Sequence, residues 1–130
     1  MSAVQTGDAV AVYGLLRSGE SGFDRFGLAG AFKALGPCLI PGRLFDLGAY
    51  PGLVDGRGEV VGELFEVRDV GVMPALDAFE DYWPGDPQRS RYERVKLDLI
   101  TPQRSAWVYR WTQSLDGARL IESGDWMQRG

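Results

Sequence analysis

The sequence has 130 residues, a net charge of −4, one cysteine and no histidine. This length fits a single domain with one core, and the acidic balance argues against nucleic acid as a partner. Since histidine is absent, Ser-His-Asp and Cys-His catalysis and histidine-based zinc sites are excluded, so any proton transfer must use carboxylates, tyrosine or lysine.

The first half of the chain predicts short elements separated by glycine and proline. A strand over residues 10–17 runs into a glycine loop. Residues 23–36 predict a weak helix, because apolar residues recur there near helical spacing. Residues 38–48 predict a strand with a bulge or bend at its Pro-Gly pair, since proline cannot donate to a central ladder. Residues 48–54 predict a loop.

The second half predicts one further helix and more strands. The expected elements are a strand over 58–67, a helix over 73–83, and strands over 91–100, 105–111 and 120–126. The last strand is expected to close onto the core through Trp126. With about six strands, two short helices and no alternating strand–helix rhythm, the sequence predicts an α+β fold with a small, mixed, bent or barrel-like sheet.

The acidic residues of the 73–83 helix fall at different angles on a helical wheel. Leu76, Phe79 and Trp83 form the apolar face, and Glu80 lies at its margin. Asp77 and Asp81 fall away from that face, so we expect both to face water. Glu80 has two interpretations. It bends to solvent or pairs with an arginine of the 89–94 segment, or it is a partly desolvated carboxylate whose raised pKa suits a general acid/base.

A second carboxylate, Glu63, lies within the 58–67 strand and is either an ion-pair partner or a second candidate acid. Gly62 beside it leaves room for close approach of a ligand or another backbone. Arg89, Arg91 and Arg94 are interpreted as a solvated strand edge, since acidic residues are interspersed among them.

A glycine turn follows the first predicted strand at Tyr13. The backbone N–H groups of Gly14, Leu15 and Leu16 could converge there on an anion. By themselves, however, these residues are more typical of an ordinary turn. No nucleotide-binding loop, hydrolase elbow or calcium loop occurs, and nothing in the sequence supports a metal site.

Several segments, in order, resemble the γ-glutamylcyclotransferase-like family. "VYGLLRSG" looks like its Tyr-Gly-Ser/Thr-Leu-Arg opening, and "GRLFDLGAYPGLV" resembles its Gly-x-Leu-Tyr/Phe-x-x-Gly-x-Tyr-Pro segment. "VVGELFEV" is similar to its Val-x-Gly-Glu-Leu-Tyr-x-Val strand. "LDAFEDY" followed by "RYERVKLDL" looks like its Leu-Asp-x-x-Glu-Gly helix and Tyr-x-Arg strand. The resemblance spans roughly residues 10 to 126.

This resemblance implies a small fold around a barrel-like sheet with a cavity. It implies an enzyme that converts a small-molecule γ-glutamyl amide to 5-oxoproline and a free amine without a cofactor. Glu80 matches the family's acid/base. The residues that match substrate-binding or cavity positions are Tyr13, Gly14, Leu15, Leu16, Tyr50 and Tyr92.

Two residues depart from the family pattern. Leu15 stands where the family usually has Ser or Thr, so a hydroxyl contact is lost while the backbone N–H remains. Asp81 follows the glutamate where glycine is common, and its charge would raise the pKa of Glu80 further. The Leu15 departure keeps open a non-catalytic module that binds a carboxylate or amine ligand. A structural domain with a filled cavity is a third interpretation.

The N-terminal residues do not resemble a secretory signal, and no segment resembles a membrane span. No apolar run approaches the roughly 18 to 20 residues of a membrane span, and the first ten residues lack the basic and apolar blocks of a secretory signal. We therefore expect a cytoplasmic protein with no membrane partner. We expect residues 1–9 to be a flexible N-terminus and residues 10–130 to form a single domain.

Overall fold

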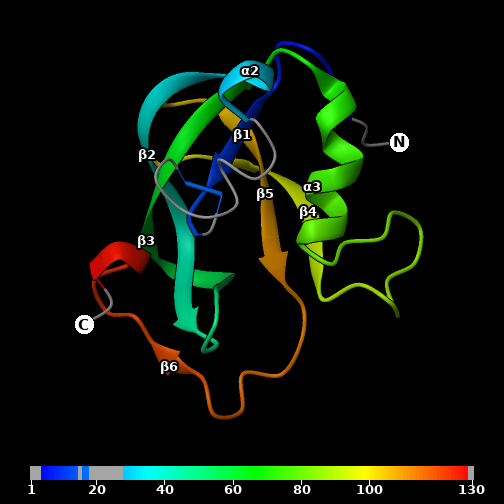
Figure 1. Ribbon diagram of the computed structural model, residues 1–130. Helices are drawn as coiled ribbons and strands as arrows, with labels where there is room; N and C mark the ends of the chain where they lie inside the picture. The colour runs from blue at the N-terminus through cyan, green and yellow to red at the C-terminus, as the bar shows by residue number, and fades with distance from the viewer. Residues whose placement is uncertain (1–3, 15, 18–27, 129–130) are drawn as a thin grey trace.

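The computed structural model describes residues 4–14, 16–17 and 28–128. Six strands form one curved sheet in the order β4-β5-β1-β3-β2-β6, and α3 lies alongside β5 and β4 (Figure 1). The strands are β1 (Ala9–Val12), β2 (Phe32–Asp46), β3 (Pro51–Val67), β4 (Tyr92–Asp98), β5 (Ser105–Trp111) and β6 (Arg119–Leu120). The helices are α2 (Leu28–Ala31) and α3 (Met73–Phe79), with 3₁₀ turns η1 (Val70–Val72) and η2 (Trp126–Gln128). The predicted α+β fold with a bent, mixed sheet is confirmed.

The long β2–β3 hairpin forms one half of the sheet. The register of this pair shifts between Pro41 and Arg43, so the bulge predicted at the Pro-Gly pair is confirmed. The helix predicted over 23–36 is wrong from Phe32 onward, since Phe32 pairs with Val67 in the ladder. The short apolar stretch fits a helix or a strand, and pairing with β3 decides between them. The segment 18–27 lies outside the described residues.

The predicted loop over 48–54 is also only partly right, because β3 already begins at Pro51. Leu53 and Val54 pair with β2 and extend the hairpin by several residues. Proline is tolerated there because it stands first in the strand. The strand carries the segment around Pro51 to the end of β1, where it becomes part of the candidate site.

β1 is short but lies at the centre of the sheet. It pairs antiparallel with β3 and, through Val10 and Trp107, parallel with β5. Alternate β1 residues enter two different apolar clusters, so both faces of this strand are covered. Leu76 of α3 packs in the second cluster with Trp107 and Tyr109 of β5. Burial of this helix face therefore fixes where the end of α3 meets the sheet.

The C-terminal segment packs against the other face. β6 pairs with the end of β2, and Trp126 is buried in the first apolar cluster, as predicted for the closing segment. In the part of the chain that the structure describes, none of the helices is both long and apolar enough to span a membrane.

Candidate functional site

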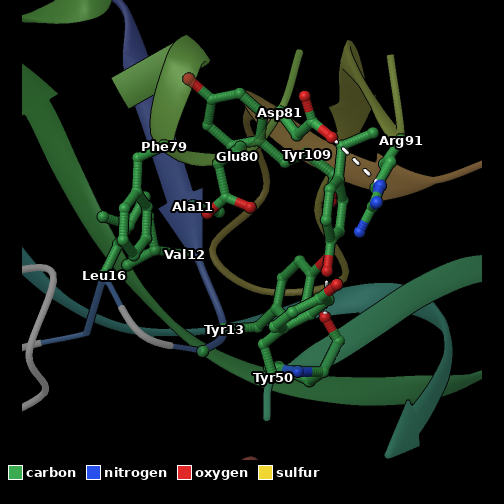
Figure 2. A pocket seen from close by; sticks show the side chains of 13 residues that line it. Ala11, Val12, Tyr13, Leu16, Tyr50, Phe79, Glu80, Asp81, Arg91 and Tyr109 are labelled. Atoms are coloured by element: carbon green, nitrogen blue, oxygen red, sulfur yellow. Dashed lines mark hydrogen bonds and ion pairs between the residues drawn. The ribbon is translucent and has the colours of Figure 1, made fainter. Parts of the chain in front are cut away.

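A cavity of about 330 Å³ opens where the end of β1, the end of α3 and the start of β4 meet (Figure 2). Its size falls within the usual range of small-molecule sites. The lining residues are Ala11, Val12, Tyr13, Gly14, Leu16, Tyr50, Pro51, Phe79, Glu80, Asp81, Arg91, Tyr92 and Tyr109.

The structure brings six of the seven predicted site residues to this one cavity. Glu80 and the predicted binding residues Tyr13, Gly14, Leu16, Tyr50 and Tyr92 all line it, and Leu15 lies outside the described residues. Their roles in binding and catalysis stay predictions. The interpretation as a domain with a filled cavity does not fit this geometry.

Glu80 follows the last residue of α3. Its N–H donates to the Leu76 carbonyl at 3.0 Å, so the helical turn continues to this position. The carboxylate points into the cavity, with Phe79 and Leu16 on one side and Arg91 on the other (Figure 2). Among the described residues it has no hydrogen-bond or ion-pair partner. Burial, and secondarily the negative charge of Asp77, raise the pKa of Glu80 to about 8.

Two tyrosine hydroxyls at the cavity bind protein groups. Tyr13 donates to the Tyr109 carbonyl at 2.7 Å and accepts from the Leu53 N–H at 3.2 Å. Tyr92 donates to the Pro51 carbonyl at 2.6 Å. Burial raises the pKa of Tyr13 and of Tyr92 well above the usual value, so both stay neutral. These side chains therefore form fixed walls of the cavity and are poorly suited to proton transfer.

Asp77 corrects one expectation from the sequence, because it is buried and does not face water. Both of its carboxylate oxygens accept from Arg94, and Oδ1 also accepts from the Tyr109 hydroxyl at 2.6 Å. A helical wheel that places only apolar residues inward cannot anticipate a helix carboxylate that pairs with a buried arginine of β4. The same pairing shows that Arg94 is not part of a solvated strand edge.

Asp81 also differs from expectation, because it lines the cavity. Its φ of 53° lies in the left-handed region, where glycine is favoured, which gives a physical reason for the glycine common at this position. Oδ1 accepts from the Trp83 indole N–H at 2.7 Å, and Oδ2 pairs with Arg91 Nε at 3.2 Å. The charge that raises the pKa of Glu80 is that of Asp77, and Asp81 is not among its causes.

Glu63 lies elsewhere. Its carboxylate pairs with Arg17 Nε at 3.4 Å, and Arg17 also binds Asp125 at 2.8 Å. The ion-pair interpretation therefore describes Glu63 better than that of a second acid. Gly62 beside it lies against the Val12 carbonyl, which confirms the predicted close approach of another backbone.

The arginines that could have paired with Glu80 have other partners. Arg89 is exposed and lies over the Trp83 ring at 3.7 Å, while Arg91 pairs with Asp81. Among the residues that the structure describes, no group of three or more acidic, cysteine or histidine side chains could hold a metal ion.

Two sequence comparisons show which known proteins this chain is similar to. The sequence model of the family described as "Gamma-glutamyl cyclotransferase, AIG2-like" matches residues 10–128. The gamma-glutamylcyclotransferase family protein YtfP of Escherichia coli is 41% identical over 88 residues, which cover 67% of this chain and 69% of that protein.

Solved structures show the same fold. The solution structure of YtfP from Escherichia coli superposes with a TM-score of 0.68 at 35% identity, over 93% of this chain and 97% of that one. The crystal structure of an AIG2-like protein from Mus musculus superposes with a TM-score of 0.63 at 22% identity, over 85% and 80% of the two chains. The second likeness concerns the fold alone.

Proposed function

The chain belongs to the gamma-glutamyl cyclotransferase, AIG2-like family, and on that premise we propose that it is an enzyme that converts a γ-glutamyl amide to 5-oxoproline and a free amine without a cofactor. The observation that carries the proposal is the carboxylate of Glu80, which points into a cavity also lined by Gly14 and Leu16. Among the described residues this carboxylate is unpaired, so it is available to a substrate.

The reaction needs a folded-back substrate and one proton carrier. The α-amine of the glutamyl group attacks its own γ-carbonyl carbon and forms the ring C–N bond, and the original amide C–N bond breaks. The proton that leaves the attacking nitrogen ends on the departing nitrogen. A cavity that holds the curled conformer supplies proximity, which lowers the barrier of such an intramolecular step.

Glu80 is the proposed proton carrier. A pKa of about 8 for its carboxyl lies close to the 7.7–8.0 of an ordinary α-amino group. Proton transfer between groups of similar pKa needs little free energy in either direction, so one carboxylate can accept the proton from the amine and return it to the leaving nitrogen. A carboxylate in water, with a pKa near 4.3, would be a much weaker base.

The loop after β1 is the proposed anchor for the glutamyl carboxylate. Among the residues that the structure describes, the backbone N–H groups of Gly14 and Leu16 have no hydrogen-bond partner. A Cβ at Gly14 would lie 2.6 Å from Pro51 Cγ, so glycine lets the Pro51 ring pack closely against the backbone here. Because backbone donors act in this proposal, leucine at position 15 is compatible with binding.

The test measures 5-oxoproline release from a panel of γ-glutamyl amides by the wild type, Glu80→Gln and Glu63→Gln. Glu63→Gln is the matched control, since this carboxylate pairs with Arg17 away from the cavity. We expect Glu80→Gln to lower kcat by about 100-fold or more, as is usual when a general acid/base is lost, and Glu63→Gln to retain activity.

Two results would count against this function. Equal rates for the wild type and Glu80→Gln would remove Glu80 from the mechanism. A ligand that raises the melting temperature of the wild type but is recovered unchanged would favour the binding module instead.

A further inference from the structure

Two charged side chains are buried behind the cavity wall. The side chains of Asp77 and Arg94 are only 9% and 8% exposed, and Arg94 Nη1 donates to both oxygens of Asp77. Removing two charges from water is costly even when they pair, and an apolar pair of similar volume often gives equal or greater stability. A buried ion pair at this place therefore invites an explanation other than stability.

Arg94 is held firmly although it is imperfectly paired. Its guanidinium lies 5.2 Å from the centre of the Tyr82 ring and 5.6 Å from that of Trp107. Its Nε is buried and has no hydrogen-bond partner among the described residues. An unsatisfied buried donor costs free energy, so the arrangement favours the position of the cation over complete hydrogen bonding.

The ion pair is connected to the cavity by two routes. Asp77 precedes Glu80 by three residues, which places the two side chains on neighbouring positions of the helix surface, about 5–6 Å apart at Cβ. Tyr109 donates its hydroxyl to Asp77 at 2.6 Å while its side chain lines the cavity. A change at Asp77 therefore reaches both the carboxylate and the wall beside it.

We propose, on the premise of the function above, that the buried Arg94–Asp77 pair is a positioning unit for Glu80. Asp77 presents a negative charge one helical turn from the Glu80 carboxylate, Arg94 limits that charge, and Tyr109 joins the pair to the cavity wall. The pair thus sets the proton affinity of Glu80.

Among the ionisable groups around the cavity, Asp77 is the one whose charge acts on the pKa of Glu80. Tyr13 from the end of β1, Tyr92 from β4 and Tyr109 from β5 all have raised pKa values and stay neutral. At the rim, Asp81 and Arg91 neutralise each other. The pKa of Glu80 is raised first by burial and second by Asp77.

The test removes each partner of the ion pair separately and follows the titration of Glu80. Asp77→Asn deletes the negative charge, so the midpoint should fall by about one pH unit. Arg94→Met leaves the charge of Asp77 uncompensated, so the midpoint should rise. Both variants break the same ion pair. If the pair had only a structural role, the Glu80 midpoint would not move in opposite directions in the two variants.

The midpoint is read from the ¹³C chemical shift of the Glu80 side-chain carboxyl, which needs no turnover. Arg94→Lys keeps the positive charge and should stay near the wild-type midpoint. Arg110→Met is the matched control, because Arg110 pairs with Glu93 and Asp55 and does not line the cavity. The double variant Asp77→Asn/Arg94→Met removes both buried charges, should fold, and should also titrate lower than the wild type.

The outcomes separate this inference from the proposed function. Midpoints that move in the same direction in Asp77→Asn and Arg94→Met, or that do not move, would overturn the inference. In the active enzyme the pH dependence of kcat/KM should move with the midpoint, and a fixed rate profile would overturn the positioning role. Absence of 5-oxoproline from every substrate would reject the proposed function alone, since the titration still decides the electrostatic role of the pair.

Discussion

Individual acidic residues of the segment 76–86 differ by environment more than by sequence position. Glu80 points into the cavity, Asp77 is buried against Arg94, and Asp81 bridges Trp83 and Arg91 at the rim. Asp86 accepts from the Arg89 N–H at 3.3 Å in an exposed turn. Of these four acids, only Glu80 is both desolvated and unpaired among the described residues, which makes it the candidate acid/base.

Glu80 should make stability depend on pH. Its folded-state pKa of about 8 lies above the unfolded value near 4.5, so the unfolded state ionises first as the pH rises. The free energy of unfolding of the wild type, compared with that of Glu80→Gln, is therefore highest below about pH 4.5 and falls as the pH rises to about 8. We expect the variant to be more stable by about 2 kcal/mol above pH 8, less than full desolvation would give because the cavity admits water.

Urea unfolding at pH 4, 6 and 9 checks this prediction. The difference between the two proteins should grow between pH 4 and pH 9. A difference that stays constant across this range would show that the carboxyl titrates at its ordinary pKa.

At the scale of elements, alternation in the sequence was sufficient to separate the two faces of β5, whose alternate residues enter the two apolar clusters. Trp107 and Tyr109 belong to the second cluster and Trp111 packs against it, so these three alternate residues share one face. The apolar pattern at the start of β2 did not distinguish a helix from a strand, because a short apolar segment fits the repeat of both. The Asp77–Arg94 pair could not be predicted, since it joins α3 to β4 across 17 residues and depends on tertiary packing.

The close pairing of β1 with β3 should tolerate no side chain at Gly62. A Cβ there would lie 2.7 Å from the Val12 carbonyl oxygen and 3.0 Å from Ile40 Cδ1. We expect Gly62→Ala to lower the free energy of unfolding by about 1–3 kcal/mol, because backbone has to move. Gly30→Ala is the control, since open space surrounds Gly30, and it should not destabilise. Similar unfolding midpoints for both variants would contradict the claim that a Cβ at Gly62 clashes with β1.

The end of α3 should prefer glycine over alanine at position 81. Both Asp81→Gly and Asp81→Ala remove the carboxylate that binds Arg91, so they differ only in how the residue adopts a φ of 53°. We expect the alanine variant to be less stable than the glycine variant by about 1 kcal/mol. Denaturant unfolding of the two proteins measures this difference directly. Equal stability would mean that the left-handed conformation is not required at this position.

At the scale of the whole molecule, the curved sheet assembles one site from segments far apart in the sequence. The end of β1, the start of β3, the end of α3 and the start of β4 all contribute to the cavity. Family motifs predicted which of these segments carry the site. They could not predict Tyr109 or Arg91 as lining residues, because those positions face the cavity only through the pairing of β5 with β1 and β4.

The pH dependence of 5-oxoproline release tests the central claim most directly. With a γ-glutamyl amide as substrate, kcat/KM of the wild type should rise with pH around a midpoint near 8, where Glu80 loses its proton. Glu80→Gln should lose about 100-fold or more in rate, and the pH dependence that remains should be that of the substrate's own α-amine. A wild-type profile without a midpoint near 8, or an unchanged rate in Glu80→Gln, would contradict the account.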